Sequence, residues 1–155
     1  FIEVMPLDAP REWTREAVLS GEELRAMIGA RWPLLPMAPE RASATGTSWR
    51  FADGAGMLQF VSSVTEPFCA SCDRSRLTAD GVFYLCLYAQ KGVDLRGPLR
   101  RGASRDELQA LIAGAWGRRA DRGAEERLRL RDRTPLVQIG RLRADPHLEM
   151  HTRGG

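Results

Sequence analysis

Residues 69–86 read CASCDRSRLTADGVFYLC, and this stretch contains the three cysteines of the 155-residue chain. Cys69 and Cys72 form a C-x2-C pair, and Cys86 follows after thirteen further residues. An odd number of cysteines argues against a disulfide framework, which normally uses an even number. Three thiols this close together in a cytosolic chain are better explained as metal ligands. The stretch therefore predicts a metal site.

Two kinds of metal fit three thiols. Three thiolates can hold three irons of a cubane iron-sulfur cluster and leave the fourth iron open to another ligand. Structural zinc takes four Cys or His ligands. The two histidines, His147 and His151, lie far downstream beside Pro146, where a disordered tail is the simpler interpretation. The pattern favours iron-sulfur over zinc but leaves both open.

The same stretch predicts a β-hairpin from strands at 74–78 and 82–87. Its turn is a three-residue loop over 79–81 with Gly81 in the left-handed conformation. This register pairs Thr78 with Val82, Arg76 with Tyr84, and Arg74 with Cys86. We prefer it to a two-residue Asp-Gly loop because it gathers the apolar side chains on one face and the arginines and cysteine on the other. Two guanidinium groups beside a metal site suit an anionic, phosphate-bearing substrate.

Composition indicates one ordinary globular domain. Hydrophobic residues make up 43% and charged residues 28% of the chain, and the net charge is +3. No apolar run approaches the roughly 20 residues that a membrane span requires, and no secretory signal is visible, so we expect a cytoplasmic protein without a membrane partner. The arginines are scattered without interleaved aromatic residues, which argues against nucleic acid as a partner. The chain starts at Phe1 instead of Met, which suggests that it is excised from something longer.

The remaining pattern predicts an α+β fold, with a small antiparallel sheet and flanking helices. Two capping boxes, Ser20 to Glu23 and Ser104 to Glu107, each predict the start of a helix. Strands are expected at Phe1–Met5, which is read as buried, and at 48–51 and 57–61. Residues 34–47 are expected to be loop. The charge-rich stretch 118–133 is expected to extend over the surface or to be mobile.

The run from Phe68 to Gly81, followed by Cys86-Leu87, strongly resembles the C-terminal region of the molybdenum cofactor biosynthesis protein A family. These enzymes are radical S-adenosylmethionine (SAM) GTP 3',8-cyclases, a class of lyase. The opening residues Phe1–Pro6, FIEVMP, resemble the strand at which the family's incomplete (βα) barrel meets this region. The resemblance extends to about Gly140, and its cysteine-arginine block is highly specific.

The resemblance implies a role for each of these residues. Cys69, Cys72 and Cys86 match the three ligands of a second 4Fe-4S cluster, whose open iron contacts the guanine of GTP. Met5 matches a methionine that contacts SAM, although from the residue alone a core methionine is the simpler interpretation. The residues that match the GTP-binding segment are Arg74, Ser75 and Arg76. The implied reaction converts GTP to (8S)-3',8-cyclo-7,8-dihydroguanosine 5'-triphosphate for molybdopterin.

The chain departs from the family pattern in two respects. It has no C-x3-C-x2-C motif, so the radical must come from an N-terminal radical SAM domain absent here, unless the chain is a standalone relative. The family ends in a double glycine, whereas here Ile139-Gly140-Arg141 is followed by a tail ending in Gly154-Gly155, and the role of that pair stays open. We therefore expect a cluster- and GTP-binding domain over 1–140 and a flexible tail over 141–155, with monomer and homodimer both open. The alternatives are a non-catalytic zinc- or cluster-stabilised interaction module and a degenerate homologue with another substrate.

Overall fold

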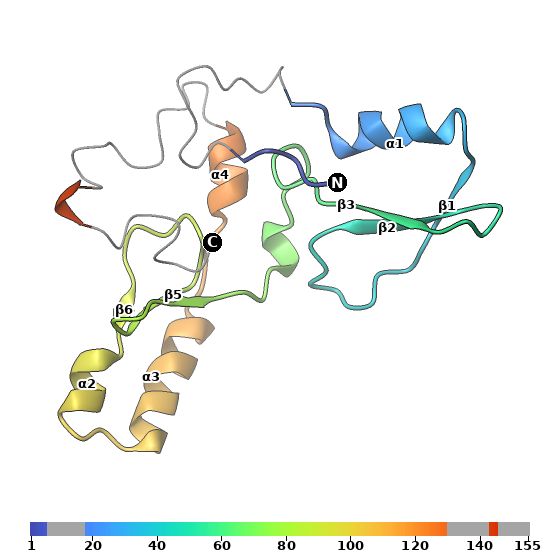
Figure 1. Cartoon of the computed structure of the whole chain (residues 1–155). Coiled ribbons are helices and arrows are strands. Elements are labelled where there is room, and N and C mark those ends of the chain that lie inside the picture. The colour runs from blue at the N-terminus through green and yellow to red at the C-terminus, as the bar shows by residue number, and fades with distance from the viewer. Residues whose placement is uncertain (6–17, 130–142, 146–155) are drawn as a thin grey trace. The chain divides into compact units, whose positions relative to one another are not determined.

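Two small antiparallel sheets organise the chain, each in a compact unit of its own. The computed structural model describes residues 1–5, 18–129 and 143–145. The first unit is Phe1–Asp73 and the second is Arg74–Gly155. The α+β class is confirmed (Figure 1), but the described residues form two three-stranded sheets where the sequence predicted one. The expected boundary near residue 140, the two histidines and the terminal glycines lie outside the described residues.

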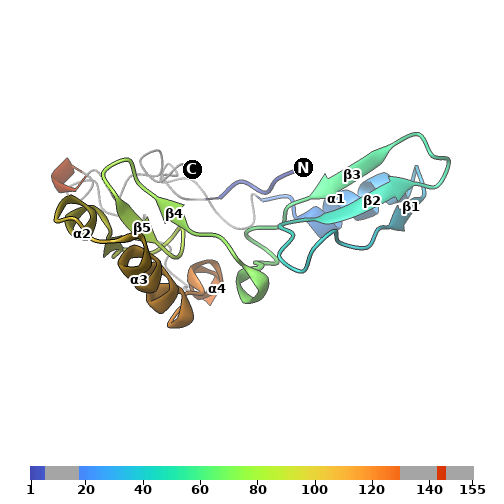
Figure 2. The ribbon, with the colours of Figure 1, turned by 90° about the horizontal axis from the view of Figure 1, so that it is seen from below.

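The sheet of the first unit has the strand order β1-β2-β3, with α1 lying over it (Figure 2). The predicted strands at 48–51 and 57–61 are confirmed as β2 and β3, and their register pairs Trp49 with Leu58. The guanidinium of Arg25 on α1 lies 4.6 Å from the centre of the Trp49 ring, so a cation–π contact joins the helix to the sheet. The elements are α1 (Gly21–Gly29), β1 (Leu34–Pro36), β2 (Thr47–Phe51), β3 (Met57–Phe60) and the 3-10 turn η2 (Cys69–Ser71).

Strand β1 corrects the expectation that residues 34–47 are all loop. It pairs with β2 at the edge of the sheet, and Pro36 stands opposite Trp49. The amide of Met37 donates to the carbonyl of Ser48 at 2.9 Å, and alternate residues of an antiparallel strand direct their amides to opposite sides. Position 36 therefore faces away from β2, where a residue without an N–H loses no ladder hydrogen bond.

The N-terminal segment is less buried than the sequence predicted. Ile2 forms a single parallel bridge with Val61, and Phe1, Ile2 and Val4 are 58%, 72% and 68% exposed. Within the segment only Glu3 is buried. Alternation explains the exposure of Ile2 and Val4, because they point away from the side on which Glu3 is buried. Phe1 shares the side of Glu3 and stacks on the Phe60 ring with 5.3 Å between the ring centres, but more than half of it stays exposed.

Both predicted capping boxes are formed. The Ser20 hydroxyl accepts from the Glu23 amide at 3.1 Å, and the Glu23 carboxylate accepts from the Ser20 amide at 2.9 Å. Ser104 and Glu107 repeat the arrangement at the start of α3 (Arg105–Gly117). These bonds satisfy backbone donors that a helix start otherwise leaves without partners.

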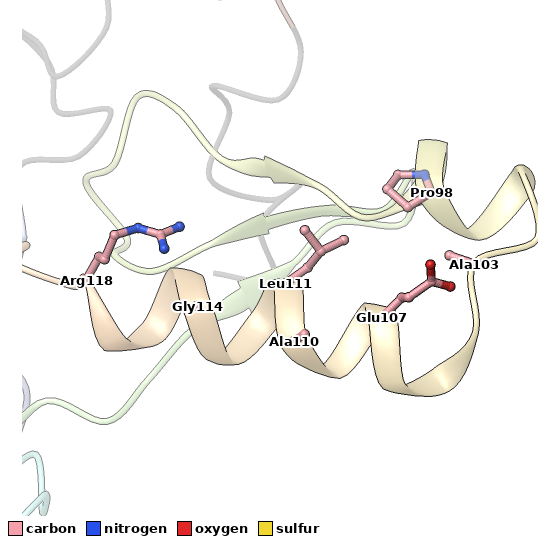
Figure 3. Close-up of a pocket in the computed structure, with 7 residues that line it drawn as sticks. All are labelled: Pro98, Ala103, Glu107, Ala110, Leu111, Gly114 and Arg118. Carbon is pink, nitrogen blue, oxygen red and sulfur yellow. The ribbon is translucent and has the colours of Figure 1, made fainter.

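The second unit holds the predicted hairpin and most of the helices. Its sheet has the order β4-β5-β6, and α2 and α3 flank the groove drawn in Figure 3. The elements are β4 (Arg76–Leu77), β5 (Val82–Tyr84), β6 (Val93–Asp94), α2 (Arg96–Arg100), α3 (Arg105–Gly117) and α4 (Gly123–Arg129).

Helix α4 lies within the stretch 118–133, which was expected to extend over the surface or to be mobile and for which no helix was predicted. Gly123 begins the helix and is buried, and a Cβ atom added there would lie 2.6 Å from the Cβ atom of Tyr88. At the same end, Arg122 Nη2 donates to Glu125 at 2.6 Å. A close backbone approach to one aromatic side chain thus anchors a helix that has few apolar residues. Residues 130–133 lie outside the described part.

Among the described residues, none of the helices combines the length and apolar character needed to cross a membrane.

Candidate functional site

The predicted ligands Cys69 and Cys72 lie at the C-terminal end of the first unit, which runs to Asp73. The turn η2 runs over Cys69–Ser71, and the amide of Cys72 donates to the carbonyl of Cys69 at 3.3 Å. Both cysteines are half-buried, and no disulfide links the three cysteines of the chain. We call residues 69–72 the cysteine turn. In a tight turn of this kind, the backbone positions that carry the two thiols of a C-x2-C pair lie close to each other.

A buried carboxylate anchors the segment that leads to the cysteine turn. Glu3 is 6% exposed and accepts four hydrogen bonds. Two are donated by the backbone amides of Val64 and Thr65, both at 2.9 Å, and one by the Thr65 hydroxyl at 2.6 Å. The fourth comes from the amide of Gly21, the first residue of α1, at 2.9 Å. The carboxylate thus joins the N-terminal segment to the start of a helix and to residues 64–65.

The surroundings of Glu3 act on its pKa in two opposite directions. Burial raises the pKa, because it disfavours the charged form. The hydrogen bonds from the Thr65 hydroxyl and from the amides of Gly21, Thr65 and Val64 lower it, and together they outweigh burial. The pKa therefore lies below its ordinary value of 4.5, and the carboxylate is ionised at neutral pH.

The predicted hairpin of the second unit has the predicted register. Arg76 pairs with Tyr84, and the Thr78 amide donates to the Val82 carbonyl at 3.0 Å. Gly81 has a φ of 86°, the left-handed conformation that the three-residue loop requires. The Thr78 hydroxyl donates to Asp80 at 2.6 Å and accepts from the Val82 amide at 3.0 Å. The buried Thr78 side chain thus stabilises the turn through hydrogen bonds to Asp80 within it and to Val82 after it.

The hairpin is shorter than predicted. Strand β5 ends at Tyr84, and Cys86 lies in a bend beyond it, half-buried. The ladder therefore stops at Arg76 and Tyr84, and the predicted pair of Arg74 and Cys86 lies outside it. The bend is closed by the amide of Ala89, which donates to the Cys86 carbonyl at 3.1 Å.

Burial of the hairpin differs from what its alternation suggests. Leu77, on the apolar face of β4, is 62% exposed, whereas Tyr84 on the arginine-bearing face is 4% exposed. Arg74 and Arg76 are half-buried, and Nη2 of Arg74 and Nε of Arg76 are buried atoms. Ser75 between them is exposed. A guanidinium group with buried nitrogens is held in a restricted orientation, which suits recognition of an anion better than a mobile surface side chain does.

The other predicted residue, Met5, is half-buried in the first unit, two residues after Glu3. The predicted ligands divide between the units, with Cys69 and Cys72 in the first and Cys86 in the second. Over residues 1–5, 18–129 and 143–145, no group of three His, Cys, Asp or Glu side chains could hold a metal ion. The donors themselves fit a thiolate-ligated cluster, because all three are thiols outside disulfides and each is partly accessible.

Sequence reasoning missed Glu3. Its partners lie 18 to 62 residues away along the chain, so no local spacing indicates it. The single available signal is an acidic residue inside an apolar run, Phe1 to Met5.

The structure also contains a groove of about 470 Å³ between α2 and α3, lined by Pro98, Leu111, Gly114 and four further residues (Figure 3).

The chain belongs to the family described as Molybdenum Cofactor Synthesis C, whose match covers residues 1–125. The sequence resemblance is thereby confirmed. A protein named GTP 3',8-cyclase 1 from Mycobacterium tuberculosis (strain CDC 1551 / Oshkosh) is 44% identical over the whole chain, which covers 43% of that protein. GTP 3',8-cyclase 3 of Mycobacterium bovis (strain ATCC BAA-935 / AF2122/97) is 42% identical, with 41% of its length covered. GTP 3',8-cyclase of Synechococcus sp. (strain WH7803) is 40% identical, with 40% covered.

The chain therefore spans less than half the length of these relatives, while each of them matches all of its 155 residues.

Proposed function

We propose that this chain is the cluster- and GTP-binding portion of a GTP 3',8-cyclase that acts in molybdenum cofactor biosynthesis. The observation that carries the proposal is the family match over residues 1–125, which includes the cysteine turn, both hairpin arginines and Cys86. The relatives named GTP 3',8-cyclase cover the whole chain at 40–44% identity, which supports the same activity. In this proposal the chain completes a radical SAM enzyme by packing at the open side of an incomplete (βα) barrel, supplied by an N-terminal domain.

The proposed cluster ligands are Cys69, Cys72 and Cys86. A 4Fe-4S cluster held by three thiolates supplies an iron with an open coordination position, to which a nucleobase nitrogen or oxygen can bind. The chain's own contribution is to hold the thiols and to orient GTP. The cysteine turn fixes the spacing of two thiols through its Cys72 to Cys69 backbone bond of 3.3 Å.

The proposed ligands of the GTP phosphates are Arg74 and Arg76. Each guanidinium can donate two parallel hydrogen bonds to phosphate oxygens, and their half-buried positions restrict the orientation of those donors. Ser75 is exposed and offers a further hydroxyl donor. Met5 is proposed to contact SAM. The main contribution of such a site to the reaction is to orient GTP, because a fixed orientation keeps the reacting atoms within attack distance.

The test uses GTP binding to the complete protein. Replacing Arg74 and Arg76 together by Ala should weaken binding by about 1.5–3 kcal/mol for each charged hydrogen bond lost, which is roughly tenfold or more per arginine. The matched control is the double change of Arg100 and Arg101 to Ala, which removes the same charge from two exposed positions in the same unit. If the hairpin variant binds GTP as tightly as the control variant does, the phosphate assignment is wrong.

A second measurement separates the proposal from a non-catalytic zinc-stabilised module. Anaerobic reconstitution with iron and sulfide should give a brown protein, and Cys86→Ser should lower the iron content and the charge-transfer absorption. Stoichiometric zinc without GTP affinity in the unsubstituted protein would favour the module instead.

A further inference from the structure

Glu3 gathers three separate segments of the first unit around one carboxylate. Oε1 accepts from the Gly21 amide at 2.9 Å and from the Thr65 hydroxyl at 2.6 Å. Oε2 accepts from the amides of Val64 and Thr65, both at 2.9 Å. The backbone of the same residue adds a bond, since its amide donates to the Val61 carbonyl at 3.1 Å.

This arrangement requires two acceptor oxygens on one side chain. Each oxygen of Glu3 faces two donors, so a side-chain amide would turn its NH2 group toward two N–H groups, or toward one N–H and one O–H group. A buried donor that loses its acceptor keeps its full desolvation penalty. The ionised carboxylate is therefore the side chain that this junction selects, and Gln is no substitute for it.

We propose that Glu3 is a positioning residue for the thiols of Cys69 and Cys72, an inference that rests on the proposed function in treating these thiols as cluster ligands. Thr65 stands four residues before Cys69. The carboxylate therefore fixes the start of the short segment that carries both thiols. The anchored residues also belong to a hydrogen-bonded turn, because the Glu66 amide donates to the Ser62 carbonyl at 3.0 Å.

The anchor also includes the segment with Met5, two residues after Glu3. One side chain thereby sets the N-terminal segment and the approach to the cysteine turn relative to each other, entirely within the first unit. A residue that merely stabilised the first unit would also affect β2 and β3, which belong to that unit, and its loss would raise amide exchange along both strands. A positioning residue affects the two thiols downstream of its anchor and leaves Cys86 unchanged.

The test is site-resolved thiol reactivity in the complete protein without metal, under reducing, anaerobic conditions. Alkylation of each cysteine by iodoacetamide is followed by mass spectrometry, together with amide hydrogen exchange. In Glu3→Gln, exchange at Val64 and Thr65 should rise by about tenfold or more, as expected when a hydrogen bond to a charged group is lost. Alkylation of Cys69 and Cys72 should accelerate relative to Cys86 in the same molecules.

The control is Glu23→Gln at the same helix end. Glu23 accepts from the Ser20 amide and hydroxyl at 2.9 and 2.6 Å and is exposed, and Gln is compatible with a capping box. It should leave all three alkylation rates unchanged. If Glu3→Gln fails to fold, Thr65→Val removes one donor of the four and should shift the same two cysteines to a smaller extent. Thr65→Ser keeps the hydroxyl and should restore the original rates.

A spectroscopic measurement addresses the thiols when the cluster is loaded. After reconstitution and reduction, the electron paramagnetic resonance signal that Cys86→Ser abolishes should change its g-values in Glu3→Gln and stay unaltered in Glu23→Gln. Equal alkylation of all three cysteines in Glu3→Gln and the unsubstituted protein would overturn the positioning role, and so would an equal rise at Cys86. Absence of a cluster and of GTP binding in the unsubstituted protein would instead sink the proposed function, while the alkylation pattern would still decide the role of Glu3.

Discussion

Gly21→Ala tests the packing at the start of α1, and its size can be worked out from the structure. Gly21 is buried at the first position of the helix. A Cβ atom there would lie 2.4 Å from the Ser62 hydroxyl oxygen and 3.4 Å from the Phe60 Cβ atom. The shorter distance is far inside van der Waals contact, and Ser62 is only 9% exposed. Either the Ser62 side chain must turn to another rotamer, or the helix start or the loop at Ser62 must move.

Two terms set the magnitude. Overpacking of this kind costs about 1–3 kcal/mol. The higher helix propensity of Ala offsets this by at most about 1 kcal/mol. The difference spans about 0–3 kcal/mol, and we expect a net loss near its middle, about 1–2 kcal/mol in the local stability of α1, which corresponds to roughly 5- to 30-fold faster amide exchange.

Amide hydrogen exchange of α1 in the complete protein measures this change. The control is Gly29→Ala at the other end of the helix, where the added Cβ meets no described atom within 4 Å. That variant should be neutral or slightly stabilised. Adding Ser62→Ala to Gly21→Ala should recover most of the loss, because it removes the clashing oxygen. Equal exchange in the two single glycine variants would refute the geometry of this junction.

Three further predictions concern charge and helix packing. The lowered pKa of Glu3 means that its ionised form favours the folded state, so its contribution is complete above the ordinary value of 4.5 and is lost as the pH falls through the lower folded value. Exchange at residues 64–65, corrected for its intrinsic pH dependence, should accelerate in that window, and Glu3→Gln should abolish the acceleration. Gly114→Ala should stabilise α3 by about 0.5–1 kcal/mol, since its nearest neighbour is the flexible end of Arg118 at 3.4 Å; unchanged or faster α3 exchange would contradict this. Gly123→Ala should destabilise α4 by about 1–3 kcal/mol through its clash with Tyr88, and slower exchange in α4 would contradict that.

The parts of the fold that sequence predicted well depend on neighbours in the chain. Both capping boxes formed as expected, because a serine and a glutamate three positions apart complete the hydrogen bonds by themselves. The hairpin register was predicted from the alternation of apolar and polar side chains, and it is confirmed by the pairing of Arg76 with Tyr84 and by the left-handed conformation of Gly81. Strands β2 and β3 were found to within one residue at each end.

The parts that sequence missed depend on distant contacts or on their absence. The loop predicted over residues 34–47 rested on Pro36, Pro39 and Gly46, but an edge strand such as β1 tolerates Pro36. Helix α4 was missed because its few apolar residues give no periodic pattern, and its anchor is the contact of Gly123 with Tyr88. The exposure of Leu77 could not be derived from alternation, which sorts side chains into two faces without saying which face is covered.

The candidate site divides in the same way. The identity of the cysteines and arginines was evident from their spacing and from the family resemblance, and the family is confirmed. The roles of these residues stay predictions. Glu3, the residue that organises the approach to the cysteine turn, lies in the opening run FIEVMP, but its role could not be derived from that run, because long-range folding brings its donors together.

Pro36 has a consequence for how copies of this protein behave when crowded. A sheet edge with outward amides is a template on which another polypeptide can add itself, the first step toward insoluble aggregates. In β1 the outward positions are 34 and 36, and at position 36 the amide donor is missing by covalent chemistry, so an incoming strand finds one donor fewer along this short edge. Replacing Pro36 by a residue with an N–H should restore that donor and make such self-association easier.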